Sequence, residues 1–136
     1  MRTRRATGLC LAASLLGMGG LSAVSVARTS SPEGTLHLSW SAPEVSLQVF
    51  TATLTCSPNA STQDYHDADR ACSDIAASGG NLKALPGRPG MNCTTYRGWK
   101  IRTTATGTWN GRPVSYDVLH KNICEARKAT DQVFVW

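Results

Sequence analysis

The chain has 136 residues, of which 41% are hydrophobic and 17% are charged, and its formal net charge is +5. This length supports one domain and excludes a large multidomain enzyme, while the mixed composition argues against a long disordered chain. Apart from the N-terminal segment, no stretch approaches the roughly 20 apolar residues that a membrane-spanning helix needs.

The N-terminus has the three parts of a secretory signal peptide. Three arginines among the first five residues precede an apolar run of leucines and small residues, which ends in Ser25-Val26-Ala27. Small residues three and one positions before a cleavage point are typical of such signals. The sequence therefore predicts a secreted protein with a signal peptide over residues 1–27, a flexible leader over 28–34 and one domain over 35–136.

Removal of this signal changes the charge. Residues 28–136 would keep eleven basic and nine acidic residues, and hence a net charge of +2. The basic residues do not cluster, and such a surface is a poor footprint for nucleic acid. We therefore expect neither a nucleic-acid partner nor a membrane partner.

Alternation of apolar and polar residues predicts the first strands. One strand covers residues 36–40. A second covers residues 45–56, where a change of phase between Val49 and Phe50 suggests a bulge. Residues 67–78 then carry apolar side chains at helical spacing, with Asp67 placed to cap the start and two glycines placed to end the helix.

In the second half of the domain, the sequence predicts an irregular segment followed by a hairpin. Residues 81–92 contain two Pro-Gly pairs. Residues 99–105 and 114–118 alternate again on either side of Asn110-Gly111, a strong signal for a tight hairpin turn. A last short strand is expected over 133–136. About five strands and one clear helix predict an antiparallel α+β domain.

Four of the five cysteines lie beyond the predicted signal peptide. They are Cys56, Cys72, Cys93 and Cys124. An even number of cysteines in a small exported domain predicts two disulfides, and four cysteines allow three pairings. A structural zinc site is not favoured, because the chain has no Cys-x-x-Cys pair and no Cys/His cluster at ligand spacing.

Few residues suggest an enzyme. The scattered serines, histidines and aspartates do not by themselves define a catalytic triad, because a triad is a geometry. Asp64, His66 and Asp67 could bind a metal, but acidic residues at this place more often mark a helix N-terminus. The four tryptophans favour core or sheet-face packing over ligand stacking. We therefore expect no metal and no cofactor.

Residues 90–98 are the most distinctive part of the domain. They are expected to form an exposed, extended loop that a disulfide holds at Cys93 and that runs directly into a strand. Such a loop can add to the substrate-binding edge of a protease as a strand would, and its tether lowers the cost of ordering. These residues by themselves favour an ordinary loop with a structural disulfide.

Eight short motifs follow in order along the chain behind the signal peptide, and the four cysteines have near-matching spacing over about 100 residues. The motifs are Leu54-Thr55-Cys56-Ser57-Pro58, Ala71-Cys72, Gly79-Gly80, Ala84-Leu85, Gly107-Thr108-Trp109-Asn110-Gly111, Val114-Ser115-Tyr116, Asn122-Ile123-Cys124-Glu125 and Val133-Phe134-Val135-Trp136. With these motifs, the chain from about residue 35 to the end resembles the Streptomyces subtilisin inhibitor family of secreted protease inhibitors.

This resemblance implies a five-stranded antiparallel sheet with one or two helices on one face. It implies the disulfides Cys56–Cys72 and Cys93–Cys124, and a homodimer without enzymatic activity. The implied targets are subtilisin-like serine proteases, with trypsin-like proteases or metalloproteases as alternatives. Inhibition would be substrate-like. The P1 side chain would enter the S1 pocket of the protease, and religation of the cleaved, disulfide-held loop would compete with release of the leaving amine.

The resemblance also implies where the reactive bond lies. Counting from Cys93 as P3 makes Thr95 P1 and Tyr96 P1′. The stretch over residues 93–107 is slightly longer than is usual in the family, and counting back from Gly107 instead makes Tyr96 P1 and Arg97 P1′. We prefer the first count, because the disulfide holds the loop where a protease would grip it. The expected protease contacts beside the reactive bond are Met91, Asn92, Cys93, Thr94 and Arg97.

Two other functions stay open. A secreted binding module could keep the fold and lack inhibition. The departure of the loop from the usual family length favours this alternative. A small extracellular enzyme has the least support. One specific nick in the loop during incubation with a protease would distinguish an inhibitor from an inert module, which is either ignored or degraded at many sites.

Overall fold

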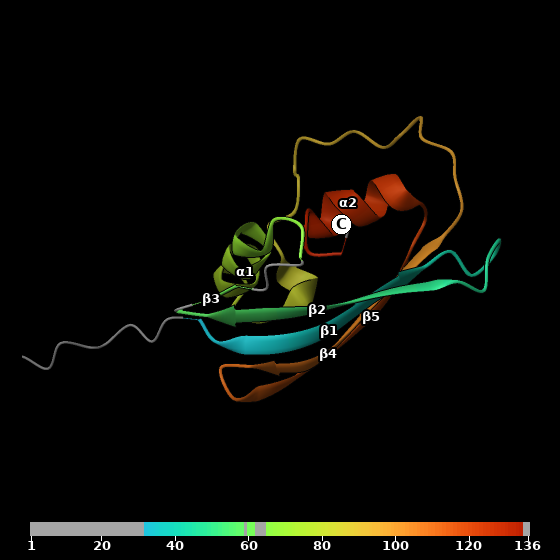
Figure 1. The fold of residues 1–136 in the computed structure, drawn as a ribbon. Helices are drawn as coiled ribbons and strands as arrows, with labels where there is room; N and C mark the ends of the chain where they lie inside the picture. Colours follow the sequence, from blue (N-terminus) through green and yellow to red (C-terminus); the bar gives the residue numbers. More distant parts are fainter. Residues whose placement is uncertain (1–31, 59, 62–64, 135–136) are drawn as a thin grey trace, which may run out of the picture.

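Alternating apolar residues of four long strands build the buried face of one antiparallel sheet, and two helices cover that face (Figure 1). The structure is a computed structural model that describes residues 32–58, 60–61 and 65–134. The predicted signal peptide and residues 28–31 of the predicted leader lie outside the described residues. Within the described part of the chain, no helix is long and apolar enough to cross a membrane.

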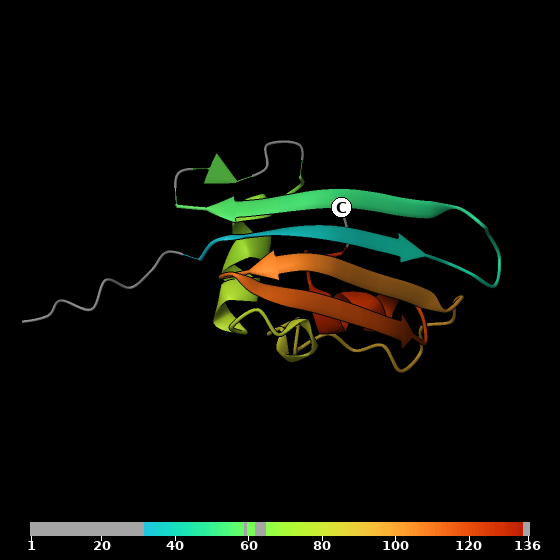
Figure 2. The ribbon, with the colours of Figure 1, turned by 90° about the horizontal axis from the view of Figure 1, so that it is seen from below.

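Strand β1 (Gly34–Ser41) lies at the centre of the sheet, between β2 (Val49–Ser57) and β4 (Ile101–Trp109) (Figure 2). Strand β5 (Arg112–His120) forms one edge, and β3 (Ala60–Ser61) lies at the other edge beside β2. The predicted antiparallel α+β class is confirmed. The expected five-stranded sheet is confirmed only in part, because four strands have eight or nine residues and the fifth, β3, has only two.

Strands β1 and β2 pair in one constant register along their whole length. The bulge expected beside Val49 is therefore wrong, and so is the strand expected over residues 45–48. Residues 42–48 lie outside the sheet and form a projecting connection, here called the β1–β2 arm (Figure 1). The change of apolar phase marks the start of β2 and not a bulge within it.

The turn between β4 and β5 confirms the hairpin prediction. Asn110 and Gly111 both have positive φ (48° and 74°), as a type I′ turn requires. The flanking residues Trp109 and Arg112 pair with each other. Asn110 N also donates to Glu33 O at 2.7 Å, which ties this turn to the chain just before β1.

Helix α1 (Ala68–Ala77) confirms the helix predicted from apolar spacing. Its buried side chains are Ala68, Ala71, Cys72 and Ile75. Gly79 and Gly80 end the helix as predicted, because both have positive φ and their N–H groups donate to carbonyls of the last turn. Asp67 occupies the N-cap position, but its side chain makes no capping hydrogen bond there, against expectation. The disulfide Cys56–Cys72 joins β2 to α1.

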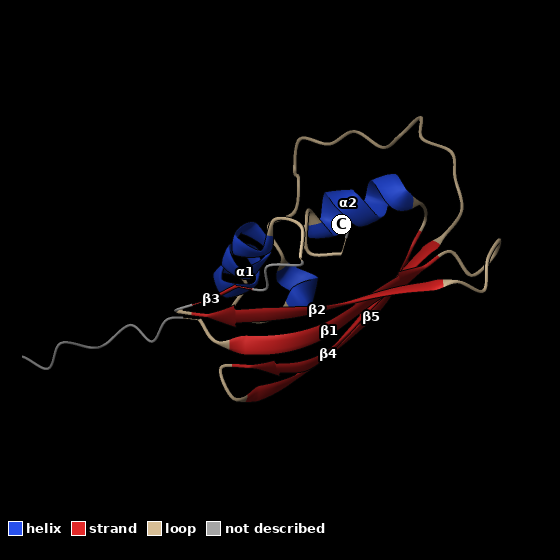
Figure 3. Cartoon of the chain, viewed as in Figure 1, coloured by secondary structure: helices blue, strands red, loops and turns tan. Residues whose placement is uncertain are grey.

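A second helix, α2 (Ile123–Thr130), packs on the same face of the sheet, and the short helix η1 (Leu82–Ala84) follows α1 (Figure 3). Apolar periodicity did not indicate α2, because only two of its residues are buried. Its start could have been found from Asn122 followed three residues later by Glu125, a pattern typical of a capped N-terminus.

The apolar C-terminal run is buried and does not form a strand over its described part. Val133 and Phe134 are 0% exposed and belong to no strand, so the strand expected over 133–136 is wrong for these two residues. The last two residues of that expected strand lie outside the described residues. Phe134 stacks on Tyr116 with ring centroids 5.3 Å apart. The run therefore fills the core beside the sheet.

Candidate functional site

Residues 85–100 connect η1 to β4 and arch around α2 (Figure 1). We call this segment the tethered loop. Residues 94–100 are all exposed, and none of them lies in a helix or strand. Cys93, immediately before them, is only 5% exposed. The loop therefore presents a continuous solvent-exposed stretch that begins at a buried anchor.

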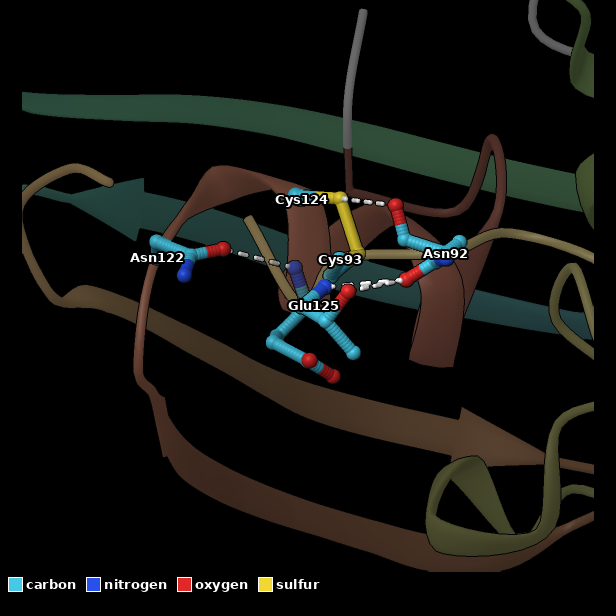
Figure 4. The surroundings of a disulfide bond; sticks show 6 residues. Asn92, Cys93, Asn122, Cys124 and Glu125 are labelled. Atoms are coloured by element: carbon cyan, nitrogen blue, oxygen red, sulfur yellow. Dashed lines mark hydrogen bonds between the residues drawn. A yellow bond between two sulfur atoms is a disulfide. The ribbon is translucent and has the colours of Figure 1, made fainter. Parts of the chain in front are cut away.

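The first anchor is the disulfide Cys93–Cys124, which fixes the middle of the tethered loop to the second residue of α2 (Figure 4). This end of the helix is itself ordered, because Asn122 Oδ1 accepts a hydrogen bond from Glu125 N at 2.9 Å. Such a cap satisfies one of the backbone donors that the first helical turn leaves unpaired. Both disulfides of the structure follow the pairing that the resemblance implies.

The second anchor holds the start of the tethered loop at the other end of α2. A Cβ on Gly87 would lie 2.2 Å from Lys128 O, and Gly87 has a φ of +56°, so this approach requires glycine. Arg88 N donates to Lys128 O at 2.8 Å, and the Arg88 guanidinium pairs with Asp131. Asp131 also lies 2.7 Å from Arg70 Nη2 and is 2% exposed. One buried carboxylate thus joins the loop, α1 and the end of α2.

The third anchor holds the end of the tethered loop beside the β1–β2 arm. Lys100 Nζ lies 2.9 Å from Glu44 Oε1, and Lys100 N donates to Glu44 Oε2 at 3.3 Å. The hydrogen bond from the Lys100 side chain lowers the pKa of Glu44, so the pair stays ionised at neutral pH. Because both side chains are well exposed, this ion pair contributes little to stability. It does place the arm next to the loop.

The backbone around the predicted reactive bond is turned. Tyr96 N donates to Cys93 O at 3.1 Å, which closes a turn over Thr94 and Thr95. Asn92 Oδ1 supports this turn by accepting hydrogen bonds from N and Oγ1 of Thr94, at 3.0 and 2.8 Å (Figure 4). The expectation of an extended loop is therefore wrong here, because the Asn92 side chain offers the backbone a local hydrogen-bonded alternative.

The structure brings the predicted reactive-site residues together on this turn. Thr95 lies within it, and Tyr96, which is 44% exposed, follows directly. Burial therefore does not distinguish Thr95 from Tyr96 as the P1 residue. Among the other predicted contacts, the structure exposes Asn92, Thr94 and Arg97, half-buries Met91 and buries Cys93.

Other candidate chemistry finds little support in the described residues. They contain no group of three or more His, Cys, Asp or Glu side chains that could hold a metal ion. His66 is exposed before α1, and Asp64 lies outside the described residues. Trp109 is buried in the core as expected, whereas Trp99 is 61% exposed on the tethered loop, against expectation.

Sequence patterns missed the second and third anchors. Arg88 and Asp131 are separated by 43 residues, and Lys100 and Glu44 by 56 residues, so no local pattern could relate them. The Pro86-Gly87 pair did indicate irregular chain, but it could not show that Gly87 packs against a helix terminus.

A small α+β domain with two disulfides, whose long exposed loop is held at three points, is suited to presenting that loop to a partner. Residues 33–122 match the family described as "Subtilisin inhibitor-like". Because this match covers more than half of the chain, the protein belongs to the subtilisin inhibitor-like family.

The chain is also similar to named Streptomyces proteins. It is 34% identical over 84 residues to subtilisin inhibitor-like protein 2 of Streptomyces rochei, covering 62% of this chain and 73% of that protein. It is 36% identical over 84 residues to the subtilisin inhibitor of Streptomyces albogriseolus, covering 62% and 57%, respectively.

A solved structure shares the fold. Streptomyces caespitosus sermetstatin, crystallised in complex with Bacillus licheniformis subtilisin, has 23% sequence identity and a TM-score of 0.55. The match covers 77% of this chain and 99% of that one. At this level of identity, the likeness supports the fold.

Proposed function

We propose that this protein inhibits a subtilisin-like serine protease and that the tethered loop is the segment the protease binds. The observation that carries the proposal is the exposed stretch over residues 94–100, which begins at a buried disulfide to a capped helix. Membership in the subtilisin inhibitor-like family and the names of the relatives support it.

The attachment of the tethered loop on both sides of the reactive bond explains how a loop that the protease can cleave would still inhibit it. A protease serine would attack the carbonyl carbon of P1, which we assign to Thr95, and the new amine would be that of Tyr96. The disulfide at Cys93 holds the acyl side, and the start of β4 holds the amine side. Because the amine stays close to the acyl-enzyme, the loop can be rejoined before the fragments separate.

The turn over Thr94 and Thr95 would have to open before the loop could add to the protease as a strand. Opening breaks the hydrogen bond between Tyr96 N and Cys93 O, at a net cost of about 1 kcal/mol. We therefore expect weaker inhibition than a preformed extended loop would give. The same turn favours a second candidate function, a secreted binding module that does not inhibit.

The predicted signal peptide supports a location outside the cell for the proposed inhibitor, and the family resemblance implies a homodimer that needs no cofactor. Mass spectrometry of the protein from the culture medium should show a chain that begins at Arg28. A secreted chain that keeps residues 1–27 would contradict this prediction. Sedimentation of the mature protein would distinguish a dimer from a monomer.

Titration of subtilisin with the purified mature protein tests the proposed function, with trypsin and a metalloprotease assayed in parallel. We expect stoichiometric inhibition of subtilisin, and mass spectrometry of the mixture should find a single cut within residues 94–98. The position of that cut identifies P1. Full subtilisin activity, together with no cut or many cuts, would favour the inert module, and inhibition of another protease alone would change the target class.

A further inference from the structure

The β1–β2 arm carries exposed apolar side chains beside the tethered loop. Leu47 is 99% exposed and Val45 is 48% exposed. The ion pair between Glu44 and Lys100 brings this arm to the end of the loop, where Trp99 is 61% exposed. Scattered apolar residues on a surface are ordinary, but a group of large ones at one end of a molecule is typical of a contact surface.

The arm is ordered by its own contacts. Val45 N and Ser46 N both donate to Ala42 O, at 3.1 and 3.0 Å, and Gln48 N donates to Ser46 Oγ at 3.0 Å. At the root of the arm, Trp40 and Phe50 stack with ring centroids 4.3 Å apart. A segment held in this way loses less conformational freedom on binding than a free loop does.

The course of the tethered loop shows on which side of the proposed reactive bond the arm lies. With Thr95 as P1, the residues after the reactive bond run from Tyr96 to Lys100, and Lys100 contacts Glu44. The arm therefore lies on the side of the loop that follows the reactive bond. Its one charged residue, Glu44, is already paired, so the rest of residues 42–48 presents an uncharged surface.

We propose that the β1–β2 arm is a second contact surface for the target protease. In this arrangement, Leu47 and Val45 pack on an apolar patch beside the part of the protease cleft that receives the residues after the reactive bond. The proposal rests on the proposed function, because the tethered loop must first engage the cleft. It extends the protease interface from the loop to a separate connection between β1 and β2.

The variant Leu47→Ser tests this surface, with Leu119→Ser as the matched control. Leu119 is also exposed (54%), but it belongs to β5 and lies outside the arm and the loop. Burying a leucine side chain on binding corresponds to a factor of about ten or more in affinity. We expect Leu47→Ser to raise the inhibition constant for subtilisin about tenfold, Leu119→Ser to leave it unchanged, and both variants to keep the wild-type melting temperature.

Hydrogen exchange of the complex supplies an independent measurement. Amides of residues 45–48 should become protected on binding subtilisin, together with those of the loop. A protected loop with an unprotected arm and an unchanged inhibition constant for Leu47→Ser would overturn the proposal and leave the proposed function intact. Equal effects of both variants would also overturn it, as would an effect of Leu47→Ser on self-association alone. A wild-type protein that neither inhibits subtilisin nor shows loop protection would overturn both proposals.

Discussion

At the scale of single residues, the identity of the P1 side chain would decide how well the proposed reactive loop fits a protease. A subtilisin-type pocket that favours large apolar side chains, as the family resemblance suggests, accepts tyrosine better than threonine. At about 25 cal/mol per Å² of apolar area, this difference corresponds to about 1–2 kcal/mol. Because Thr95 and Tyr96 are both exposed, the choice depends on which one the disulfide aligns with the protease serine.

The substitution Thr95→Met should lower the inhibition constant for subtilisin about tenfold, because the longer apolar side chain fills the pocket. Titration of subtilisin with the wild type and the variant measures this change. The substitution Tyr96→Ala is the companion test. If Tyr96→Ala weakens inhibition strongly while Thr95→Met has no effect, Tyr96 is P1 and the count from Cys93 is wrong.

His120 is a second residue whose environment has a measurable consequence. It is the last residue of β5 and is 8% exposed. Its Nε2 is hydrogen-bonded to Thr103 Oγ1, 2.8 Å away. Burial lowers the pKa of His120, although the charge of Glu125 opposes this shift. The folded protein therefore holds His120 neutral at pH values where an unfolded chain would protonate it.

The free energy of unfolding should consequently decrease as the pH falls below about 6.5, where the unfolded histidine begins to bind a proton. This stability continues to fall until the pH reaches the lowered pKa of His120 in the folded state. Above pH 6.5, the stabilising contribution of His120 is fully present. Urea unfolding between pH 5.5 and 8 measures this slope. The variant His120→Gln, which can keep a hydrogen bond to Thr103, should show a smaller slope; an unchanged slope would assign the effect to other groups.

At the scale of the elements, the two disulfides have different roles. Cys56–Cys72 links a strand to a helix within the core, whereas Cys93–Cys124 links a helix to an exposed loop. Sequence separations of 16 and 31 residues correspond to about 3 and about 4 kcal/mol of stability, respectively, in the chain-entropy account. The two bonds are therefore comparable in stability and distinct in what they position.

Because the two disulfides are comparable in stability and differ in what they position, removing each one in turn gives a matched pair of variants. The double substitutions Cys93→Ser/Cys124→Ser and Cys56→Ser/Cys72→Ser should lower the unfolding free energy by about 4 and about 3 kcal/mol, respectively. Only the first should turn the inhibitor into a substrate, because the acyl side of the cut is then released. Denaturant titration and the time course of subtilisin inhibition measure the two effects. Lasting inhibition by the first variant would show that the disulfide does not hold the reactive bond together.

At the scale of the whole molecule, Asp131 connects parts of the chain that are distant in sequence. Its buried carboxylate pairs with Arg70 of α1 and with Arg88 of the tethered loop. Leaving a buried carboxylate without partners is costly, so each arginine helps to keep the other two elements in place. The loop is thereby coupled to the core and not only to α2.

The two arginines allow this coupling to be tested. Arg70→Gln and Arg88→Gln each remove one partner of Asp131, but only Arg88 belongs to the loop. Both variants should lower the melting temperature, and Arg88→Gln alone should speed cleavage of the reactive bond severalfold. Thermal unfolding and mass spectrometry of the protease mixture report on the two properties. Equal cleavage rates for the two variants would mean that Asp131 stabilises the fold without positioning the loop.

Local patterns predicted the parts of this fold that depend on local physics. Asn110-Gly111 predicted its hairpin, because both residues adopt the positive φ that the turn requires. Gly79-Gly80 predicted the end of α1 for a similar reason. Val133 and Phe134 were mistaken for a strand, since an apolar run has the same composition whether it pairs with a sheet or fills a core.

The sequence by itself determined the α+β class, the central strands, the hairpin, the first helix and the presence of two disulfides, because each depends on neighbouring residues or on simple counts. The family resemblance supplied the cysteine pairing and the interpretation of residues 90–98, which already stood out in the sequence, as a protease-binding loop. Only the tertiary structure decided that the tethered loop is held at three points and turned at Thr94 and Thr95. Its anchors join residues far apart in the chain, and its turn depends on whether a side chain or a partner takes the backbone hydrogen bonds.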